Sequence, residues 1–232
     1  AAPLQPLCSQ SVPVTTWGGL FARQPRAGEV KTRLQSCLTP EQAAALYTGF
    51  VLDTAAILGA CKAYHKVVAY TGEGAAEGLP KLLRDAGDFD YRPQVDGSLG
   101  ERLEQLFDAS FAAGSSATIV IGTDSPSLPP PLLDQALDLL ETHQVVIGPS
   151  TDGGYYLLGL SVPMPALFSD QISWGTGSVL AQTLEAAADH SLALLPVWYD
   201  VDLPSEAAFL RAHLRALRQA GQSTGKHSLA VL

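Results

Sequence analysis

The sequence has few cysteines, few charged residues and no excess of positive charge. Its three cysteines, Cys8, Cys37 and Cys61, form no CxxC pair, so we expect reduced thiols and no cysteine metal site. Charged residues make up 16% of the 232 residues, and the formal net charge is −9. This balance argues against a nucleic-acid binder, because such a protein needs a basic face to displace the counterions of the phosphates.

Long apolar runs are also missing. No run reaches the roughly 18–20 residues that a membrane-spanning helix needs. The first residues contain no basic segment followed by an apolar stretch, which would be typical of a signal peptide. We therefore expect a cytoplasmic protein without a membrane span.

The residues that are present predict a single α/β domain. Hydrophobic residues make up 47% of the chain, which is enough for a sizeable core. Strand-like runs alternate with helix-like segments, which predicts a mostly parallel sheet with helices on both faces. The predicted strands span residues 14–21, 66–70, 117–122, 145–148, 155–159 and 192–198. The predicted helices span residues 40–57, 79–83, 99–111, 130–142, 179–188 and 205–220, with Thr39 and Ser205 as caps of the first and last. We place the domain at residues 13–221 and expect loose tails at 1–12 and 222–232.

A basic loop follows the first predicted strand. Arg23, Arg26, Lys31 and Arg33 lie close together in an otherwise acidic chain. Phosphate recognition needs such groups, because a guanidinium forms bidentate hydrogen bonds and an ammonium supplies a point charge. Gly28, in the same loop, would let the backbone approach a ligand closely. The alternative interpretation is a solvated basic loop.

Carboxylates follow two of the predicted strands. Asp124 comes just after the apolar run of residues 117–122, at the sheet edge where α/β proteins bind ligands. A carboxylate there can hold Mg²⁺ or Mn²⁺, which then bridges phosphate oxygens. The alternative is a turn before Pro126. Asp202 follows the last predicted strand and is either a second metal ligand or the start of a turn.

A turn signal, Asp152-Gly153-Gly154, precedes two adjacent tyrosines. Neighbouring residues of a strand point to opposite faces, so we expect one of Tyr155 and Tyr156 to line a cleft and the other to enter the core. Asp152 is a candidate general base, or it shapes its own turn.

Two other glycine-containing segments match phosphate-binding motifs only in part. The segment 72–78 follows the second strand rather than the first, and its spacing is one residue too long for a dinucleotide motif. The segment 28–32 lacks two of the glycines of a P-loop. The five histidines show no metal-ligand spacing, and we assign none of them to chemistry.

Four motifs occur in one order along the chain. They are Lys31-Thr32-Arg33-Leu34, Thr123-Asp124-Ser125-Pro126, Asp152-Gly153-Gly154-Tyr155 and Asp202-Leu203-Pro204-Ser205-Glu206. In this order they resemble the bacterial nucleotide-diphospho-sugar transferase-like family, over residues 14–220. The first two motifs also resemble 2-phospholactate guanylyltransferases and, more distantly, molybdenum-cofactor guanylyltransferases. The resemblance implies a single-domain, Rossmann-like glycosyltransferase-A fold.

The resemblance also implies a donor site and an acceptor side. The implied nucleotide-binding residues are Ala22, Arg23, Lys31, Arg33, Gly97, Leu99 and Thr123, with Asp124 and Asp202 as ligands of Mg²⁺ or Mn²⁺. The implied acceptor-side residues are Gly153, Gly154, Tyr155 and Trp174, and the catalytic candidates are Asp152 and Lys31. For Trp174 the alternative is that it packs a loop. The chain departs from the family at Ser98, where members often carry Asp, and it has Asp-Ser-Pro where many glycosyltransferases have Asp-x-Asp.

Three functions remain open from the sequence. The first, which we favour, is transfer of a sugar from a nucleotide-diphospho-sugar to an unidentified acceptor. The second is transfer of a nucleotidyl group from an NTP to a phosphorylated acceptor, which the cations of Lys31 and Arg33 favour. The third is a non-catalytic nucleotide-binding module, against which the pair of Asp124 and Asp202 argues.

Overall fold

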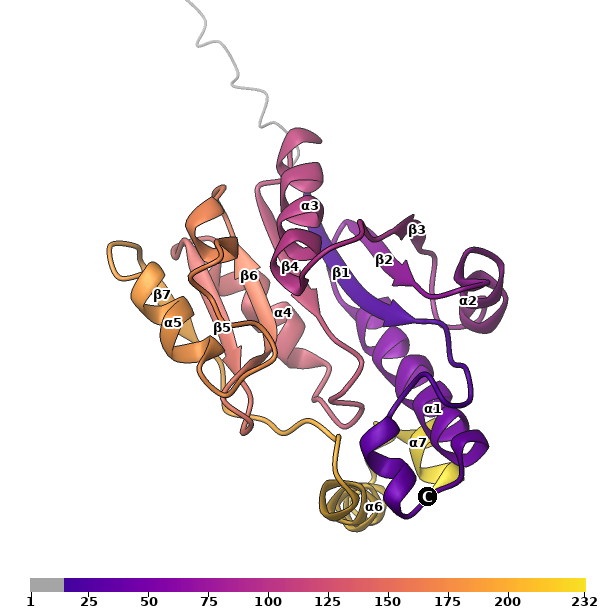
Figure 1. Cartoon of the computed structure of the whole chain (residues 1–232). Helices are drawn as coiled ribbons and strands as arrows, with labels where there is room; N and C mark the ends of the chain where they lie inside the picture. Colours follow the sequence, from indigo (N-terminus) through magenta and orange to yellow (C-terminus); the bar gives the residue numbers. More distant parts are fainter. Residues whose placement is uncertain (1–14) are drawn as a thin grey trace, which may run out of the picture.

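A seven-stranded sheet forms the centre of the molecule. The computed structural model describes residues 15–232. The strand order is β3-β2-β1-β4-β6-β5-β7 (Figure 1). The strands are β1 (Thr16–Arg23), β2 (His65–Thr71), β3 (Asp90–Pro93), β4 (Ala117–Ile121), β5 (Val145–Pro149), β6 (Tyr155–Leu160) and β7 (Leu192–Leu194). β6 pairs antiparallel with β4 and β5, and the other pairs are parallel. The mostly parallel α/β fold predicted from the sequence is therefore confirmed.

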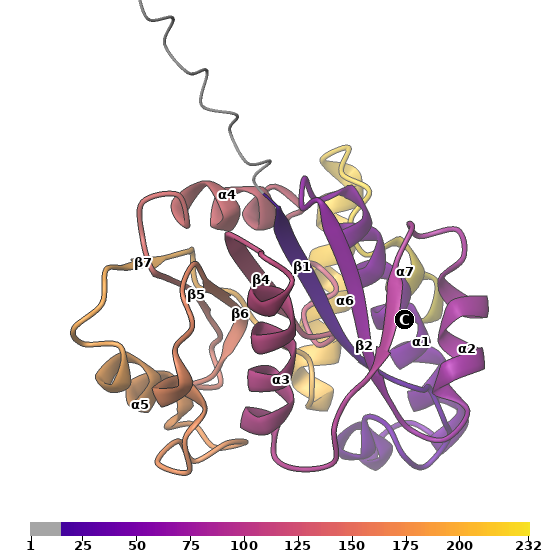
Figure 2. The ribbon, with the colours of Figure 1, turned by 90° about the horizontal axis from the view of Figure 1, so that it is seen from above.

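Helices cover both faces of this sheet (Figure 2). One face carries α1 (Pro40–Ala60), α2 (Ala75–Leu83), α4 (Pro131–Leu139), α6 (Pro204–Gln219) and α7 (Lys226–Val231). The other carries α3 (Leu99–Ala112), the 3-10 helix η2 (Pro165–Phe168) and α5 (Val179–Ala186). The 3-10 helix η1 (Thr32–Ser36) follows the basic loop. Successive residues of β1 alternate between the two cores, with Phe21 against the α3 side and Ala22 in the α1 side.

The long helix α1 is part of the core. Its N-cap is Thr39, as predicted. The Thr39 hydroxyl accepts a hydrogen bond from the backbone N–H of Gln42, and the Gln42 side chain accepts one from the backbone N–H of Thr39. Its length and hydropathy would suit a membrane span, but 67% of its most apolar 18-residue window is buried inside the protein. The apolar character of α1 is thus explained by packing against the sheet and α7.

Several predicted elements differ from the observed ones. Ser205 does not cap the last predicted helix, because α6 begins at Pro204. The Glu206 carboxylate instead accepts hydrogen bonds from the backbone N–H groups of Asp202 and Leu203. β7 stops at Leu194, shorter than predicted, since Pro196 cannot donate to a ladder. The strand β3 was not predicted. Val14, the predicted start of the first strand, and Cys8 lie outside the described residues.

The segment after Gly221 is not a loose tail, and that expectation is wrong. It forms α7, which lies beside α1 in both views (Figures 1 and 2). Asp53 of α1 is 3% exposed, and its carboxylate accepts hydrogen bonds from the backbone N–H groups of His227 and Ser228 and from the Ser228 hydroxyl, at 3.0, 2.8 and 2.6 Å. These long-range bonds satisfy the free N–H groups at the start of α7.

Candidate functional site

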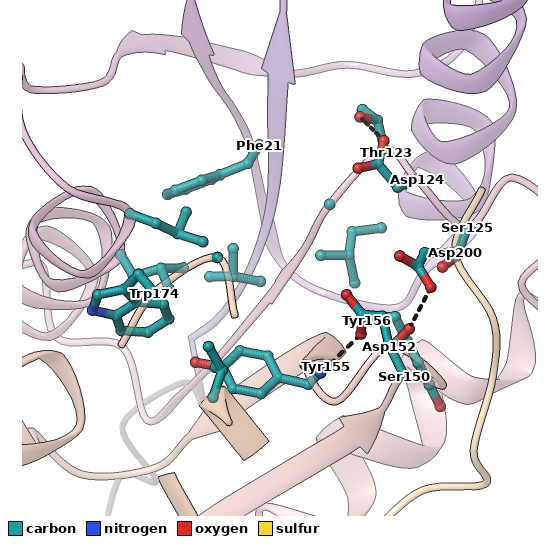
Figure 3. Close-up of a pocket in the computed structure, with 18 of the residues that line it drawn as sticks. Phe21, Thr123, Asp124, Ser125, Ser150, Asp152, Tyr155, Tyr156, Trp174 and Asp200 are labelled. Atoms are coloured by element: carbon teal, nitrogen blue, oxygen red, sulfur yellow. Dashed lines mark hydrogen bonds between the residues drawn. The ribbon is translucent and has the colours of Figure 1, made fainter. Parts of the chain in front are cut away.

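A cavity of about 550 Å³ opens at the carboxyl ends of β1 and β4. The ends of β1 and β4, the hairpin between β5 and β6, and the start of α3 contribute to its wall (Figure 3). Because β6 runs opposite to its neighbours, the loop that precedes it reaches the same edge as the loops that follow the parallel strands. Ligands of α/β proteins bind at this edge.

The structure brings most of the predicted site residues to this cavity. Its lining includes Ala22, Arg23, Arg33, Leu99, Thr123, Asp124, Asp152, Gly154, Tyr155, Trp174 and Asp202. Lys31 lines an adjoining cavity of about 250 Å³, together with Arg23, Arg33, Thr123, Asp124 and Asp202. Gly97 and Gly153 lie in neighbouring loops and do not line either cavity. Their φ angles of 141° and 89° are positive, so both glycines shape the loops that carry other site residues.

Lys31 joins the two candidate metal ligands. Its Nζ atom lies 2.6 Å from Oδ1 of Asp124 and 2.7 Å from Oδ1 of Asp202, and it donates to the carbonyl oxygen of Val201 at 2.8 Å. Burial alone would lower the pKa of Lys31, but attraction to the two carboxylates outweighs it and raises that pKa. An ammonium group has three N–H donors, and these three acceptors use all of them. The contact of Lys31 with phosphate therefore stays a prediction. It requires a phosphate oxygen to replace one of these three acceptors of the ammonium group.

The backbone at Lys31 is strained. Its φ of 46° and ψ of 44° lie in the left-handed region, and among the non-glycine residues of the described chain it alone has a positive φ. Such a conformation costs on the order of 1–3 kcal/mol and persists where surrounding contacts hold it. Here the contacts of the ammonium hold it. A backbone bond from the N–H of Val201 to the carbonyl oxygen of Asp124, at 2.9 Å, ties the two acid-bearing loops together directly.

Tyr47 of α1 connects the ends of β1 and β4. Its hydroxyl oxygen accepts hydrogen bonds from the backbone N–H of Arg23 and from the Thr123 hydroxyl, both at 3.1 Å. Its side chain is buried in the core. Its hydroxyl adds a second role, because it fixes the positions of the two loops that line the cavity.

The acid pair suits a divalent cation that also binds phosphate. The side chains of Asp124 and Asp202 are 46% and 33% exposed, so both carboxylates can be reached from the cavity. Within residues 15–232, no group of three or more His, Cys, Asp and Glu side chains surrounds one point. Mg²⁺ is commonly held by one or two carboxylates, with water and substrate phosphates as its other ligands. The two aspartates therefore fit such an ion, and the neighbouring guanidinium groups of Arg23 and Arg33 suit the phosphates that would complete its shell.

Two further carboxylates lie on the hairpin side of the cavity (Figure 3). Asp152 accepts a hydrogen bond from the backbone N–H of Gly154 at 2.8 Å, so it shapes its own turn. Asp200 accepts one from the Ser150 hydroxyl at 2.9 Å. Burial raises the pKa of Asp200, and the negative charges of Asp152 and Asp202 raise it further. Sequence reasoning did not place Asp200 on this side, because its partner lies 50 residues away in the chain.

Aromatic side chains line the other side of the cavity. Tyr155 and Trp174 pack edge to face, with ring centroids 6.4 Å apart. Burial raises the pKa of Tyr155. Tyr155 and Tyr156 belong to opposite cores, as predicted, but both border the cavity. Tyr155 thus lines the cavity and Tyr156 is buried in the core, as expected, and Tyr156 also borders the cavity because the cavity reaches both faces at the end of the sheet.

Comparison with known proteins identifies the family. Residues 54–176 match the family model DUF2064, described as an uncharacterized protein conserved in bacteria. The chain belongs to this family. A protein from Desulfovibrio desulfuricans G20, provisionally named a nucleotide-diphospho-sugar transferase, is 30% identical, with 93% of each chain covered and a TM-score of 0.79. A search of curated proteins gave no match.

More distant solved structures share the fold of this DUF2064 chain. A cytidylyltransferase from Leptospira borgpetersenii serovar Hardjo-bovis is 14% identical, covers 94% of this chain and 93% of its own, and has a TM-score of 0.58. A Mycobacterium tuberculosis H37Rv protein solved as a complex with manganese is 19% identical, covers 85% and 97%, and has a TM-score of 0.51. The fold is thus that of nucleotide-diphospho-sugar transferases and nucleotidyltransferases, as the resemblance implied.

Proposed function

We propose that this protein transfers a sugar from a nucleotide-diphospho-sugar to an acceptor, with Mg²⁺ or Mn²⁺ as its cofactor. The observation that carries the proposal is the meeting of Asp124, Asp202 and Lys31 at the carboxyl edge of the sheet, beside Arg23 and Arg33. Guanidinium groups bind the oxygens of a diphosphate through bidentate hydrogen bonds, and a divalent ion held by carboxylates binds the same oxygens directly. The name of the Desulfovibrio protein and the manganese in the Mycobacterium complex support the same chemistry.

Each residue near the donor has a distinct role in this proposal. Asp124 and Asp202 would hold the divalent ion, whose positive charge would stabilise the departing diphosphate. Arg23 and Arg33 would bind phosphate oxygens. Lys31 would keep the two aspartates in place and limit their repulsion of the donor.

The acceptor side would supply the base. During transfer, an oxygen of the acceptor forms a bond to the anomeric carbon of the sugar, and the bond from that carbon to the diphosphate breaks. The proton of the acceptor hydroxyl passes to a carboxylate. Asp152 is the candidate from the sequence, and Asp200 is a second candidate because its raised pKa brings it closer to the working pH of a general base.

Thermal melting with a ligand panel tests the proposal. Each nucleotide sugar, NDP and NTP is added with and without Mn²⁺ or Mg²⁺, since a ligand that binds the folded state raises the melting temperature. We expect one nucleotide sugar to raise it in a metal-dependent way. Asp124→Ala should lose the metal-dependent part, whereas Asp108→Ala, an exposed position on α3, should keep it. If no nucleotide changes the melting temperature, the proposal is wrong.

Nucleotidyl transfer is the second candidate. The observation that favours it is the adjoining cavity, where Arg23, Lys31 and Arg33 lie together with the acid pair. A triphosphate carries more negative charge than a diphosphate and needs more cations around it. Stabilisation by an NTP but by no nucleotide sugar, followed by release of pyrophosphate with a phosphorylated acceptor, would establish this reaction. Release of an NDP from a nucleotide sugar would establish sugar transfer instead.

A further inference from the structure

Arg102 is a cation in the cavity wall, and within residues 15–232 its side chain has no protein partner. It lies in the first turns of α3 and lines the main cavity. Its Nε atom is buried and has no hydrogen-bond partner. Among residues 15–232 no acidic side chain pairs with its guanidinium group, whereas Arg23 pairs with Glu29 and Arg33 with Asp202, both at 3.5 Å. Burying a guanidinium N–H without a hydrogen-bond partner is unfavourable, so this arrangement is one that an anionic ligand would stabilise.

The cavity wall on the α3 side is mainly apolar and aromatic, and Gln94 also lines it. Leu99 and Leu103 flank it on α3 and line the same cavity. Two residues before Arg102, the indole of Trp174 packs so closely on Gly100 that an added Cβ would clash with it. Figure 3 shows Phe21, Tyr155 and Trp174, which we call the aromatic wall, gathered on one side of the cavity, and Asp124, Asp152 and Asp200 on the other. The four carboxylates that line the cavity are all on the loops after β4 and β7 and in the β5–β6 hairpin, and none is on α3.

The aromatic wall and Arg102 lie on the face of the sheet that α3 covers. The residues that position Asp124 and Asp202 lie on the face that α1 covers. Leu103 packs with Val120 and Leu158 in the core under α3. Tyr47, which lines the adjoining cavity with the acid pair, belongs to the core under α1. The resemblance places Gly97 and Leu99, at the start of α3, against the nucleotide, so a donor whose phosphates lie at Asp124 and Asp202 would leave the part of the cavity beside Arg102 and Trp174 for a second molecule.

We infer that Arg102 binds an anionic group, a phosphate or a carboxylate, on the second substrate, whose apolar part lies against the aromatic wall. A guanidinium group suits either anion, because its parallel N–H groups match two oxygens at once. The inference rests on the proposed function, because a transferase requires a second substrate. It adds the chemical class of that substrate, an apolar molecule with one anionic group.

Small aromatic probes test the inference. Phenyl phosphate, benzoate and the neutral benzyl alcohol are titrated into the protein by NMR, with wild type, Arg102→Gln, Arg102→Lys and Arg84→Gln compared. Arg84 is a matched control because its side chain is 78% exposed and lies outside the cavity. We expect an anionic probe to bind wild type more tightly than benzyl alcohol, and Arg102→Gln to weaken that binding at least about tenfold. Arg102→Lys should fall between them, and Arg84→Gln should match wild type. The tighter of phenyl phosphate and benzoate identifies the anion.

A nucleotide titration on the same variants separates the inference about Arg102 from the proposed function. We expect a nucleoside diphosphate with Mn²⁺ to bind Arg102→Gln within about twofold of wild type, a difference of about 0.4 kcal/mol. If wild type and Arg102→Gln bind the anionic probes equally, or neither binds them, the inference is wrong. It is also wrong if Arg102→Gln loses nucleotide and probe affinity to the same extent, because the guanidinium would then contact the donor. The proposed function is judged separately, by nucleotide binding to wild type. An unchanged melting temperature and circular dichroism spectrum show that the variants are folded.

Discussion

Replacing Lys31 by Met would test whether this side chain is the internal cation of the acid pair. Met has a similar length and shape, and as an L residue it has the same intrinsic cost as Lys in the left-handed backbone conformation at this position. The substitution therefore removes mainly the ammonium group and its contacts with Asp124, Asp202 and Val201. The two carboxylates would then lie close together without a positive charge between them.

The expected loss of stability follows from the exposure of the three groups. Breaking a fully buried ion pair costs about 3–5 kcal/mol, and breaking an exposed one costs at most about 1 kcal/mol. The Lys31 side chain is 4% exposed, but Asp124 and Asp202 are 46% and 33% exposed and can be rehydrated. We expect an intermediate loss of about 2 kcal/mol, which lowers the melting temperature of a domain of this size by about 4–8 °C.

Calorimetry with a Mn²⁺ titration would measure both parts of the effect. The uncompensated carboxylates should bind the ion more tightly, and an ion concentration ten times its Kd would restore about 1.4 kcal/mol. Lys81→Met is the control, because that side chain is 79% exposed and pairs only with Glu77 across one helical turn. The reasoning is refuted if Lys31→Met melts at the temperature of wild type. It is also refuted if Mn²⁺ stabilises wild type as much as the variant.

Three other substitutions test the acceptor side and the packing of α7. Asp200 should titrate above the ordinary aspartate pKa of 3.8. Because the folded state then binds this proton more tightly than the unfolded state, Asp200 contributes stability below pH 3.8, and that contribution is lost as the pH rises through its raised pKa. Carbon-13 NMR of the carboxyl groups, with Asp200→Asn for assignment, would measure that pKa, and a value at or below 3.8 would contradict the site description. Asp53→Ala should cost about 2–3 kcal/mol in urea unfolding, because three hydrogen bonds to α7 are lost, and proteolysis should then cut near Gly221. Gly49→Ala, normally stabilising by about 1 kcal/mol inside a helix, should destabilise by about 1–3 kcal/mol, because its Cβ would lie 2.9 Å from the Ser228 backbone. A higher melting temperature for Gly49→Ala would contradict this packing.

Local patterns in the sequence predict most of the sheet, and contacts between distant segments decide the rest. β4 is identifiable because every residue from Ala117 to Ile121 is apolar or small and the whole strand is buried. β3 gives no such signal, because its four residues Asp90–Pro93 are mostly polar and pair with β2 at the sheet edge. α7 is held by Asp53, which is more than 170 residues away in the chain. A segment of six residues is too short to show a periodicity from which a helix could be predicted.

In the site, too, local patterns predict some residues, and contacts between distant segments decide the others. Asp124 could be predicted because the end of a buried strand is readable from one apolar run. The contact of Lys31 with Asp202 could not be predicted from spacing, since 171 residues separate them, although motif order placed both in one site. Asp200 becomes a candidate only through its contact with the hairpin and its burial. Arg102 becomes one only because the folded protein leaves it without an acidic partner, which no sequence pattern reports.

The reversed direction of β6 has a consequence for how such a site can change during evolution. In a wholly parallel sheet, each strand contributes only the loop that follows it to the ligand-binding edge. Here the hairpin of residues 150–154 lies at that edge between two paired strands, and it carries Asp152 and leads directly into Tyr155. Residues inserted at the tip of a hairpin leave the pairing of its strands unchanged. Homologous proteins with different acceptors are therefore expected to differ in the length of this hairpin while keeping the acid pair and its lysine in the same places.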